Sequence, residues 1–196
     1  MESLPGSVLD RRPIVVALAG PNGAGKTTFY HAHLRGAGLR LVNADVLARE
    51  LKMDAYAAAR AAGAIREELL RQRESFVFET VFSDPVGDKL GFLRAAAEAG
   101  YTVLLCFIGV AGPEVSEERV AMRVLQGGHD VPSEKLTARF PRILENLRTA
   151  LREAPHVWVF DNDDLQRPYR LVAVVEGGKV VRVEEAVPEW LRGAMP

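Results

Sequence analysis

The sequence is poor in cysteine, because Cys106 is the only one among its 196 residues. A single cysteine excludes an internal disulfide bond and fits a reducing compartment such as the cytoplasm. Cys106 lies in the apolar run 101–108, which predicts a buried strand. We therefore interpret Cys106 as a core residue rather than as a catalytic nucleophile.

Long hydrophobic segments and an excess of one charge are also missing. No stretch reaches the roughly 20 apolar residues that cross a membrane. The apolar run behind Arg11 and Arg12 breaks at Gly20, which is too early for a secretory signal. The formal net charge is -1, so no basic excess points to nucleic acid. We therefore expect a cytoplasmic protein with no membrane and no nucleic acid among its partners.

What the sequence does contain is a regular alternation of apolar runs and helical patterns. Hydrophobic residues make up 48% of the chain, which is enough for a substantial core. Five apolar runs predict strands over 14–19, 39–43, 75–80, 101–109 and 156–160. The alternation predicts an α/β fold, a three-layer α/β/α sandwich around a mainly parallel five-stranded sheet whose carboxyl edge holds the ligand site.

The segments between these runs predict helices. They begin at about 26, cover about 46–73, extend from the candidate N-caps Ser83 and Asp84 to about 99, and cover 114–126 and 132–153. Pro141 is expected to kink or divide the last of them. The pattern over 171–183, with Gly177 and Gly178 at its centre, predicts a β-hairpin.

One loop carries the clearest functional signal. The sequence Gly20-Pro21-Asn22-Gly23-Ala24-Gly25-Lys26-Thr27 matches the phosphate-loop pattern G-x-x-x-x-G-K-[ST] in full, between an apolar strand and a helix. The glycines let backbone N–H groups converge on phosphate oxygens, and the helix directs its positive end at the same anion. Lys26 supplies a charge for the β- and γ-phosphates, and the Thr27 hydroxyl supplies a ligand for Mg²⁺. We predict that this loop and Thr28 bind ATP.

Other phosphate-loop classes fit less well. An ABC ATPase carries an LSGGQ-like signature and a strand that ends in Asp-Glu, and residues 126–128 resemble that signature only superficially. A GTPase carries Asn-Lys-x-Asp, which residues 161–164 do not match. The short chain and its arginine-bearing helices favour a small-molecule kinase.

Motifs beyond the loop carry a family resemblance. Residues 20–28, with their spacing to 43–45 (Asn-Ala-Asp), 78–80 (Phe-Glu-Thr) and 118–123 (Glu-Arg-Val-Ala-Met-Arg), resemble the zeta-toxin family of P-loop kinases. The block Gly-Gly-His-Asp-Val-Pro at 127–132, followed by Arg139, resembles the compact chromosomal branch described as "ABC-type ATPase". The resemblance covers about residues 13–165.

This resemblance implies an activity and partners. The activity is ATP-dependent phosphorylation of a sugar nucleotide, typically at the 3′-hydroxyl of UDP-N-acetylglucosamine, with toxicity as its result and an antitoxin protein as a partner. We accordingly divide the chain into a flexible lead at 1–12, a P-loop kinase domain with a helical lid at 13–165, and a C-terminal β-hairpin appendage at 166–196 packed on the same domain.

Asp45 is the candidate catalytic base. It follows the second predicted strand, on the edge that faces the acceptor in P-loop kinases, and the family's general base maps onto this position. A carboxylate there would orient the acceptor hydroxyl and accept its proton. The alternative is an N-cap for a helix that starts at Val46, and the two roles are compatible.

Several polar residues are predicted to hold the acceptor. Glu79 would bind it by hydrogen bonds or order a magnesium-bound water, unless a backbone N–H satisfies this carboxylate. The predicted acceptor site consists of Asn43, Asp45, Glu79, Thr80, Ser83 and His129.

The predicted helical lid supplies arginines. Arg119, Arg123 and Arg139 would neutralise charge on the ATP phosphates, and the alternative for each is a solvated helix face. Asn162 follows the fifth strand, where P-loop kinases pack the adenine, and its alternative role is to form a turn.

The leading hypothesis is therefore an ATP- and Mg²⁺-dependent kinase for a small acceptor with a hydroxyl group. One alternative is a kinase for another acceptor, such as an antibiotic or a nucleoside. Another is a regulatory nucleotide-binding module without turnover. Asp45 and the lid arginines argue against such a module, which needs neither.

Replacing Lys26 by alanine is expected to abolish nucleotide turnover, because the charge that stabilises the β- and γ-phosphates is lost. The measurement is ADP release in the presence of Mg²⁺ and a metabolite pool. Full activity in this variant would contradict the phosphate-loop assignment.

Overall fold

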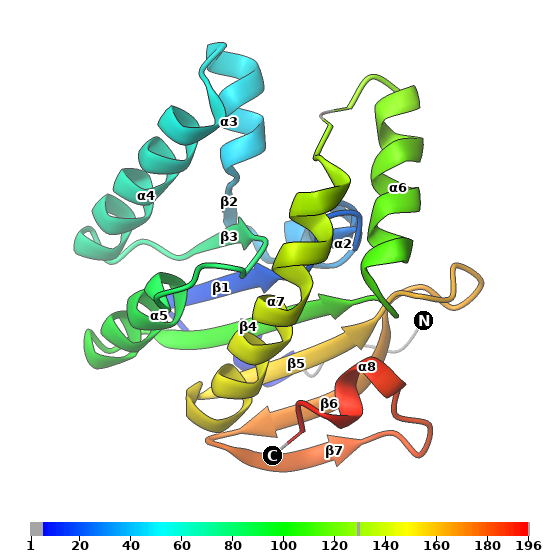
Figure 1. The fold of residues 1–196 in the computed structure, drawn as a ribbon. Helices are drawn as coiled ribbons and strands as arrows, with labels where there is room; N and C mark the ends of the chain where they lie inside the picture. The colour runs from blue at the N-terminus through cyan, green and yellow to red at the C-terminus, as the bar shows by residue number, and fades with distance from the viewer. Residues whose placement is uncertain (1–5, 129, 196) are drawn as a thin grey trace.

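A seven-stranded sheet forms the centre of the molecule (Figure 1). The computed structural model describes residues 6–128 and 130–195. The strands are β1 (Ile14–Ala19), β2 (Arg40–Val42), β3 (Phe76–Thr80), β4 (Thr102–Gly109), β5 (His156–Asp161), β6 (Arg170–Glu176) and β7 (Lys179–Val183). Their order is β2-β3-β1-β4-β5-β6-β7, with parallel pairing as far as β5 and antiparallel pairing beyond it. The predicted mainly parallel sheet is confirmed.

The C-terminal hairpin changes the predicted strand count. β6 pairs antiparallel with β5, for example Val175 with Val157, and β7 pairs with β6. The turn between β6 and β7 lies at Gly177 and Gly178, which both have positive φ. Because residues 171–175 are buried like those of a central strand, the hairpin extends the main sheet from five strands to seven.

Helices cover both faces of this sheet. They are α1 (Gly6–Leu9), α2 (Lys26–Phe29), α3 (Ala44–Leu51), α4 (Ala55–Arg71), α5 (Asp88–Glu98), α6 (Pro113–Leu125), α7 (Ser133–Glu153) and α8 (Glu189–Arg192). A π-helical turn (Tyr30–Leu34) and a 3-10 turn (Arg35–Ala37) continue α2. In Figure 1, α5 and α7 lie on one face of the sheet and α2 lies on the other, which gives the predicted three layers. Residues 1–5 of the predicted lead lie outside the described residues.

The segment 46–73 was predicted as a helical stretch, and it contains two helices. The Asn43 side chain accepts hydrogen bonds at the start of α3, and the Asp54 side chain accepts them at the start of α4. Between these caps, Lys52 adopts a left-handed conformation with φ of 53° that ends α3. Two N-caps therefore start two helices where the Ala-rich composition alone indicated a helical stretch.

The start of α5 differs from the prediction, and at Pro141 one of the two predicted outcomes, a division of the helix, is not found. α5 begins at Asp88 with Gly87 as its cap, so Ser83 and Asp84 are not N-caps. α7 continues through Pro141 as one helix and is not divided there. Ile143, Leu147, Ala150 and Leu151, which follow the proline, are buried in the core, and this packing offsets the cost of an interior proline.

The core lies on both sides of β1, whose six residues are all fully buried. Side chains of α4, α5, α7 and α8 form the cluster on one face, and side chains of α1 and α2 belong to the cluster on the other. Cys106 is buried in β4, and burial raises the pKa of its thiol, as expected for a core residue. Within the described residues, no helix combines the length and apolar character that a bilayer crossing requires.

The packing of α7 leads to a stability prediction. Leu147→Ala is expected to lower the free energy of unfolding by about 2–5 kcal/mol, because a fully buried side chain leaves a cavity. Leu125→Ala is the matched control, since Leu125 on α6 is 84% exposed, and its effect should stay within about 0.5 kcal/mol. Urea unfolding followed by tryptophan fluorescence measures both. Equal losses would contradict this placement of α7.

Candidate active site

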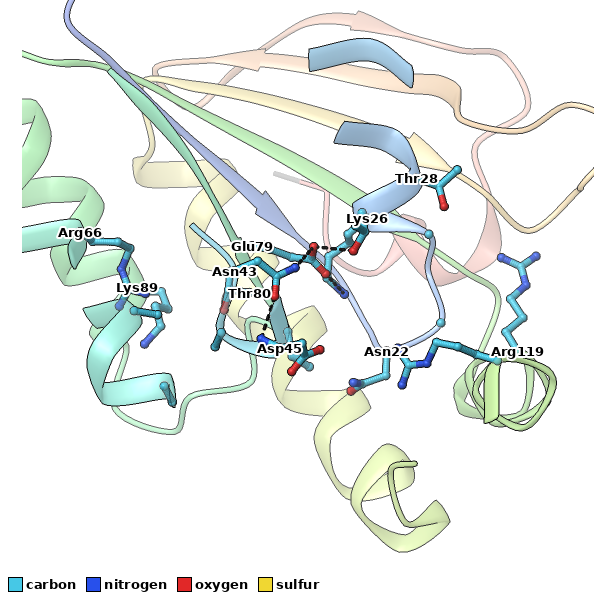
Figure 2. Close-up of a pocket in the computed structure, with 18 residues that line it drawn as sticks. Asn22, Lys26, Thr28, Asn43, Asp45, Arg66, Glu79, Thr80, Lys89 and Arg119 are labelled. Atoms are coloured by element: carbon cyan, nitrogen blue, oxygen red, sulfur yellow. Dashed lines mark hydrogen bonds and ion pairs between the residues drawn. The ribbon is translucent and has the colours of Figure 1, made fainter. Parts of the chain in front are cut away.

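The loops that follow β1, β2 and β3 meet at the carboxyl edge of the sheet. They surround a pocket of about 380 Å³ (Figure 2). The lining residues that the sequence predicted as site residues are Asn22, Gly23, Gly25, Lys26, Thr27, Thr28, Asn43, Asp45, Glu79, Thr80, Arg119 and Arg123. Among the described residues, six predicted site residues do not line it: Gly20, Pro21, Ala24, Ser83, Arg139 and Asn162. His129 lies outside the described residues.

The phosphate loop needs glycine where the backbone approaches other groups. Gly25 has φ of 87°, and a Cβ there would lie 2.7 Å from Tyr169 Oη and 2.9 Å from Asn162 Nδ2. A Cβ at Gly20, which has φ of 142°, would lie 2.1 Å from the carbonyl oxygen of Ile108. Both the backbone conformation and the available space therefore exclude larger residues.

Lys26 begins α2, and its side chain folds back over the loop. Its Nζ donates hydrogen bonds to the carbonyl oxygens of Gly20 at 3.0 Å and Pro21 at 2.8 Å. The pKa of Lys26 is lowered, chiefly by burial. The carboxylates of Glu79 and Asp45 oppose this shift, and Arg123 adds to it. Two carboxylates and a second cation therefore act electrostatically on this buried ammonium group.

Glu79 at the end of β3 connects three segments. Its Oε2 accepts hydrogen bonds from Thr27 Oγ1 at 2.8 Å and from Asn43 Nδ2 at 2.7 Å. Its Oε1 lies 3.9 Å from Lys26 Nζ. The donors are side chains and not the backbone N–H that was the alternative, and they come from the first turn of α2 and the N-cap of α3.

Asp45 lies in the first turn of α3, with its carboxylate in the pocket. Asn43 Oδ1 accepts hydrogen bonds from the backbone nitrogens of Asp45 at 2.8 Å and Val46 at 3.3 Å, so Asn43 is the N-cap. The alternative that Asp45 caps a helix starting at Val46 is therefore wrong. Figure 2 shows the Asp45 carboxylate turned toward the phosphate loop.

α6 places two arginines on the other side of the phosphate loop. Arg119 and Arg123 are one helical turn apart and both line the pocket. The Arg119 guanidinium donates to the carbonyl oxygens of Asn162 at 2.7 Å and Asp163 at 2.9 Å, which joins α6 to the loop after β5. Arg139 lies on α7 and does not line the pocket.

Asn162 supports the phosphate loop from outside the pocket. It is 4% exposed, and its Nδ2 donates to the carbonyl oxygen of Ala24 at 2.9 Å. Its Oδ1 accepts from the backbone nitrogen of Tyr169 at 3.2 Å, and Tyr169 Oη donates to the carbonyl oxygen of Gly25 at 3.0 Å. Asn162 thus braces the phosphate loop, and its contact with adenine stays a prediction.

Two cations in the pocket were not predicted from the sequence. Arg66 on α4 and Lys89 on α5 line it together with Ala59 and Ala62. Residues 59, 62 and 66 share one helical face because they are three and four positions apart. In the sequence, only the spacing of two alanines and one arginine on one helical face indicated that Arg66 enters the pocket.

A family comparison adds to this geometry. The AAA_33 family model, described as "AAA domain", matches residues 15–149, which is more than half of the chain. The chain belongs to this AAA domain family. A comparison with curated proteins found no match.

Solved structures resemble this AAA domain at low sequence identity. A chain of the AvrRxo1-ORF1:AvrRxo1-ORF2 complex is 21% identical with a TM-score of 0.70, over 90% of this chain and 62% of that chain. The same complex has been solved with ATP. The chromosomal toxin–antitoxin system PezAT of Streptococcus pneumoniae is 17% identical with a TM-score of 0.62, over 84% of this chain and 72% of that chain.

A shikimate kinase from Bacteroides thetaiotaomicron is 20% identical with a TM-score of 0.50, over 79% of this chain and 89% of that chain. The chain thus spans about 62% of the length of the AvrRxo1 complex chain that it matches. Together with the family match, these likenesses show a P-loop NTPase-like, kinase-like α/β fold, as predicted.

The bracing of the phosphate loop leads to a graded prediction. Asn162→Ala should lower the free energy of unfolding by about 1–3 kcal/mol, because the buried carbonyl of Ala24 loses its side-chain donor. Tyr169→Phe removes the hydroxyl that donates to the Gly25 carbonyl, in a half-buried side chain, and should cost only about 0.5–1.5 kcal/mol. Urea unfolding compares the two variants, and an Asn162→Ala protein as stable as the wild type would contradict the bracing role.

Proposed function

We propose that this AAA domain is a small-molecule kinase that transfers the γ-phosphate of ATP to a hydroxyl group. One observation carries the proposal: the Asp45 carboxylate and the phosphate loop with Lys26 line the same pocket. A phosphate loop alone fits any nucleotide-binding protein. A carboxylate placed where an acceptor would meet the terminal phosphate fits transfer to a hydroxyl group.

The nucleotide would lie along the phosphate loop. The N–H groups of residues 22–27 and the ammonium group of Lys26 would bind its phosphates, in place of the Gly20 and Pro21 carbonyls that Lys26 now contacts. Arg119 and Arg123 would approach these phosphates from α6, where charge develops in a loose transition state.

Mg²⁺ fits the oxygen donors beside this loop. The Thr27 hydroxyl and the Glu79 carboxylate lie 2.8 Å apart, and Mg²⁺ prefers such hard oxygen ligands. Over residues 6–128 and 130–195, no group of three or more His, Cys, Asp or Glu side chains could hold a metal without further ligands. Thr27 would hold Mg²⁺ directly and Glu79 through water. When bound, Mg²⁺ supplies positive charge at the β- and γ-phosphates.

Asp45 would act on the acceptor. Its carboxylate would accept a hydrogen bond from the acceptor hydroxyl and take the proton as the oxygen forms a bond to the γ-phosphorus. The bond from that phosphorus to the bridging oxygen breaks, and ADP leaves. Asn43 caps α3 and so fixes the turn that carries Asp45.

For the acceptor, we propose a sugar nucleotide such as UDP-N-acetylglucosamine. The motif resemblance to zeta toxins supports this choice, and so does the fold likeness to PezAT, a toxin–antitoxin system. The same two observations support an antitoxin-like protein as a partner. The alternatives are a kinase for another acceptor, such as an antibiotic or nucleoside, and a nucleotide-binding module without turnover.

Asp45→Asn is expected to lower kcat by about 10²- to 10⁴-fold, because the amide cannot accept the proton. The KM for ATP should change little, since the phosphate loop is intact. Asp54→Asn is the matched control, because it removes one carboxylate outside the pocket, and asparagine is as good an N-cap as aspartate. The assay measures transfer from ATP to UDP-N-acetylglucosamine and to a metabolite pool by mass spectrometry.

Each outcome distinguishes one of the alternatives. An unchanged kcat in Asp45→Asn would rule out Asp45 as the base. A different phosphorylated product would replace the sugar nucleotide as acceptor, and ATP consumption that no acceptor stimulates would favour the regulatory module. Slower bacterial growth on expression of the wild type, but not of Asp45→Asn, would support the toxin assignment.

A further inference from the structure

Two basic side chains lie in the pocket beyond the proposed catalytic carboxylate. Arg66 comes from α4 and Lys89 from α5, whereas Arg119 and Arg123 come from α6. In Figure 2, Arg66 and Lys89 lie on the opposite side of Asp45 from Arg119. The pocket therefore has cations at both ends, and only one end adjoins the phosphate loop.

Arg66 is held in position by aromatic rings rather than by an acid. Its Cζ lies over the ring of Phe78 at 5.1 Å and over the ring of Phe92 at 5.5 Å. Its Nε is buried and has no hydrogen-bond partner in the structure. The pKa of Arg66 is lowered by burial, and the Glu67 carboxylate opposes this shift. Arg66 thus lines the pocket with a guanidinium whose Nε–H has no protein acceptor.

Neither cation is neutralised by a close carboxylate. Among the described residues, no ion pair within 4.0 Å is formed by Arg66 or by Lys89. Glu67 follows Arg66 and Asp88 precedes Lys89 along the chain, and Asp84 Oδ2 accepts from the backbone nitrogen of Lys89 at 3.4 Å. Asp84 Oδ1 is buried and also has no partner. Around the whole pocket, five cationic side chains (Lys26, Arg66, Lys89, Arg119 and Arg123) face two acids, Asp45 and Glu79, which leaves a net positive charge.

We propose that Arg66 and Lys89 form an oxyanion subsite that binds a phosphate or carboxylate group of the acceptor. The proposal rests on the proposed kinase function, since it places the acceptor between this subsite and the phosphate loop. Arginine binds both groups through two parallel N–H donors, and lysine adds a point charge. The acceptor is then an anion with its reactive hydroxyl near Asp45 and its charged group toward α4 and α5.

The first experiment identifies the acceptor and its charge. The wild-type protein is incubated with ATP, Mg²⁺ and a metabolite pool, and the product is analysed by mass spectrometry. We expect an acceptor that already carried a phosphate or a carboxylate, and its formula distinguishes the two groups. A neutral acceptor would overturn the proposal.

The second experiment uses Arg66→Met and Lys89→Met with that acceptor. Each is expected to raise the KM for the acceptor at least about tenfold, because a charge-assisted contact is lost, while the KM for ATP stays within about twofold. Methionine preserves the apolar contact with Phe78 and Phe92. Arg71→Met is the matched control, because Arg71 is on the same helix but pairs with Glu68 outside the pocket. An unchanged acceptor KM in both pocket variants would overturn the proposal.

A binding measurement separates this proposal from the kinase function. The protein is loaded with Mg²⁺ and a non-hydrolysable ATP analogue, which occupies the phosphate loop, and inorganic phosphate is then titrated. We expect a saturable shift of the Arg66 Nε–Hε resonance, assigned by its absence in Arg66→Met. No shift would overturn the subsite, whereas a shift without any phosphorylated product would retain the subsite and refute the kinase function.

Discussion

The geometry of the site depends on the contacts that the Glu79 carboxylate makes. Because β3 lies between β2 and β1, its carboxyl end is within reach of the loops that follow both neighbours. One oxygen accepts from Thr27 and Asn43, and the other faces Lys26. The phosphate loop and the start of α3 are therefore positioned against the same acid, although they are separated along the chain.

Asn43 shows why the residue type matters at this junction. Its amide oxygen caps α3 and its amide nitrogen donates to Glu79, so one side chain supplies both an acceptor and a donor. Aspartate would cap the helix equally well but would place a second carboxylate at Glu79. The orientation of Asp45, two residues later, thus depends on a contact that involves neither the nucleotide nor the acceptor.

The elements that could be predicted are those that local sequence determines. β1 is a continuous apolar run, and its predicted bounds are those found, because both faces of the strand are buried. The phosphate loop was recognisable because glycine and lysine at fixed spacing have few other uses. Placing Asp45 and Glu79 in one pocket required only the rule that parallel strands share a carboxyl edge.

The elements that were missed depend on contacts between distant segments. The boundary between α3 and α4 follows from the Asn43 and Asp54 caps, which compete with the helix propensity of the alanines around them. The pairing of β6 with β5 could not be read from either strand alone. Arg66 enters the pocket because the rings of Phe78 and Phe92, on other elements, fix its side chain.

The support of the phosphate loop extends beyond the region that defines the family. The matched region ends at residue 149, yet Asn162 holds the backbone of the loop, and the preceding Asp161 accepts from Trp190 Nε1 at 3.1 Å. Trp190 also packs against Gly109, where a Cβ would lie 2.2 Å from its ring. A fragment cut at residue 149 would therefore lose Asn162 and Trp190, and with them these contacts beneath the phosphate loop.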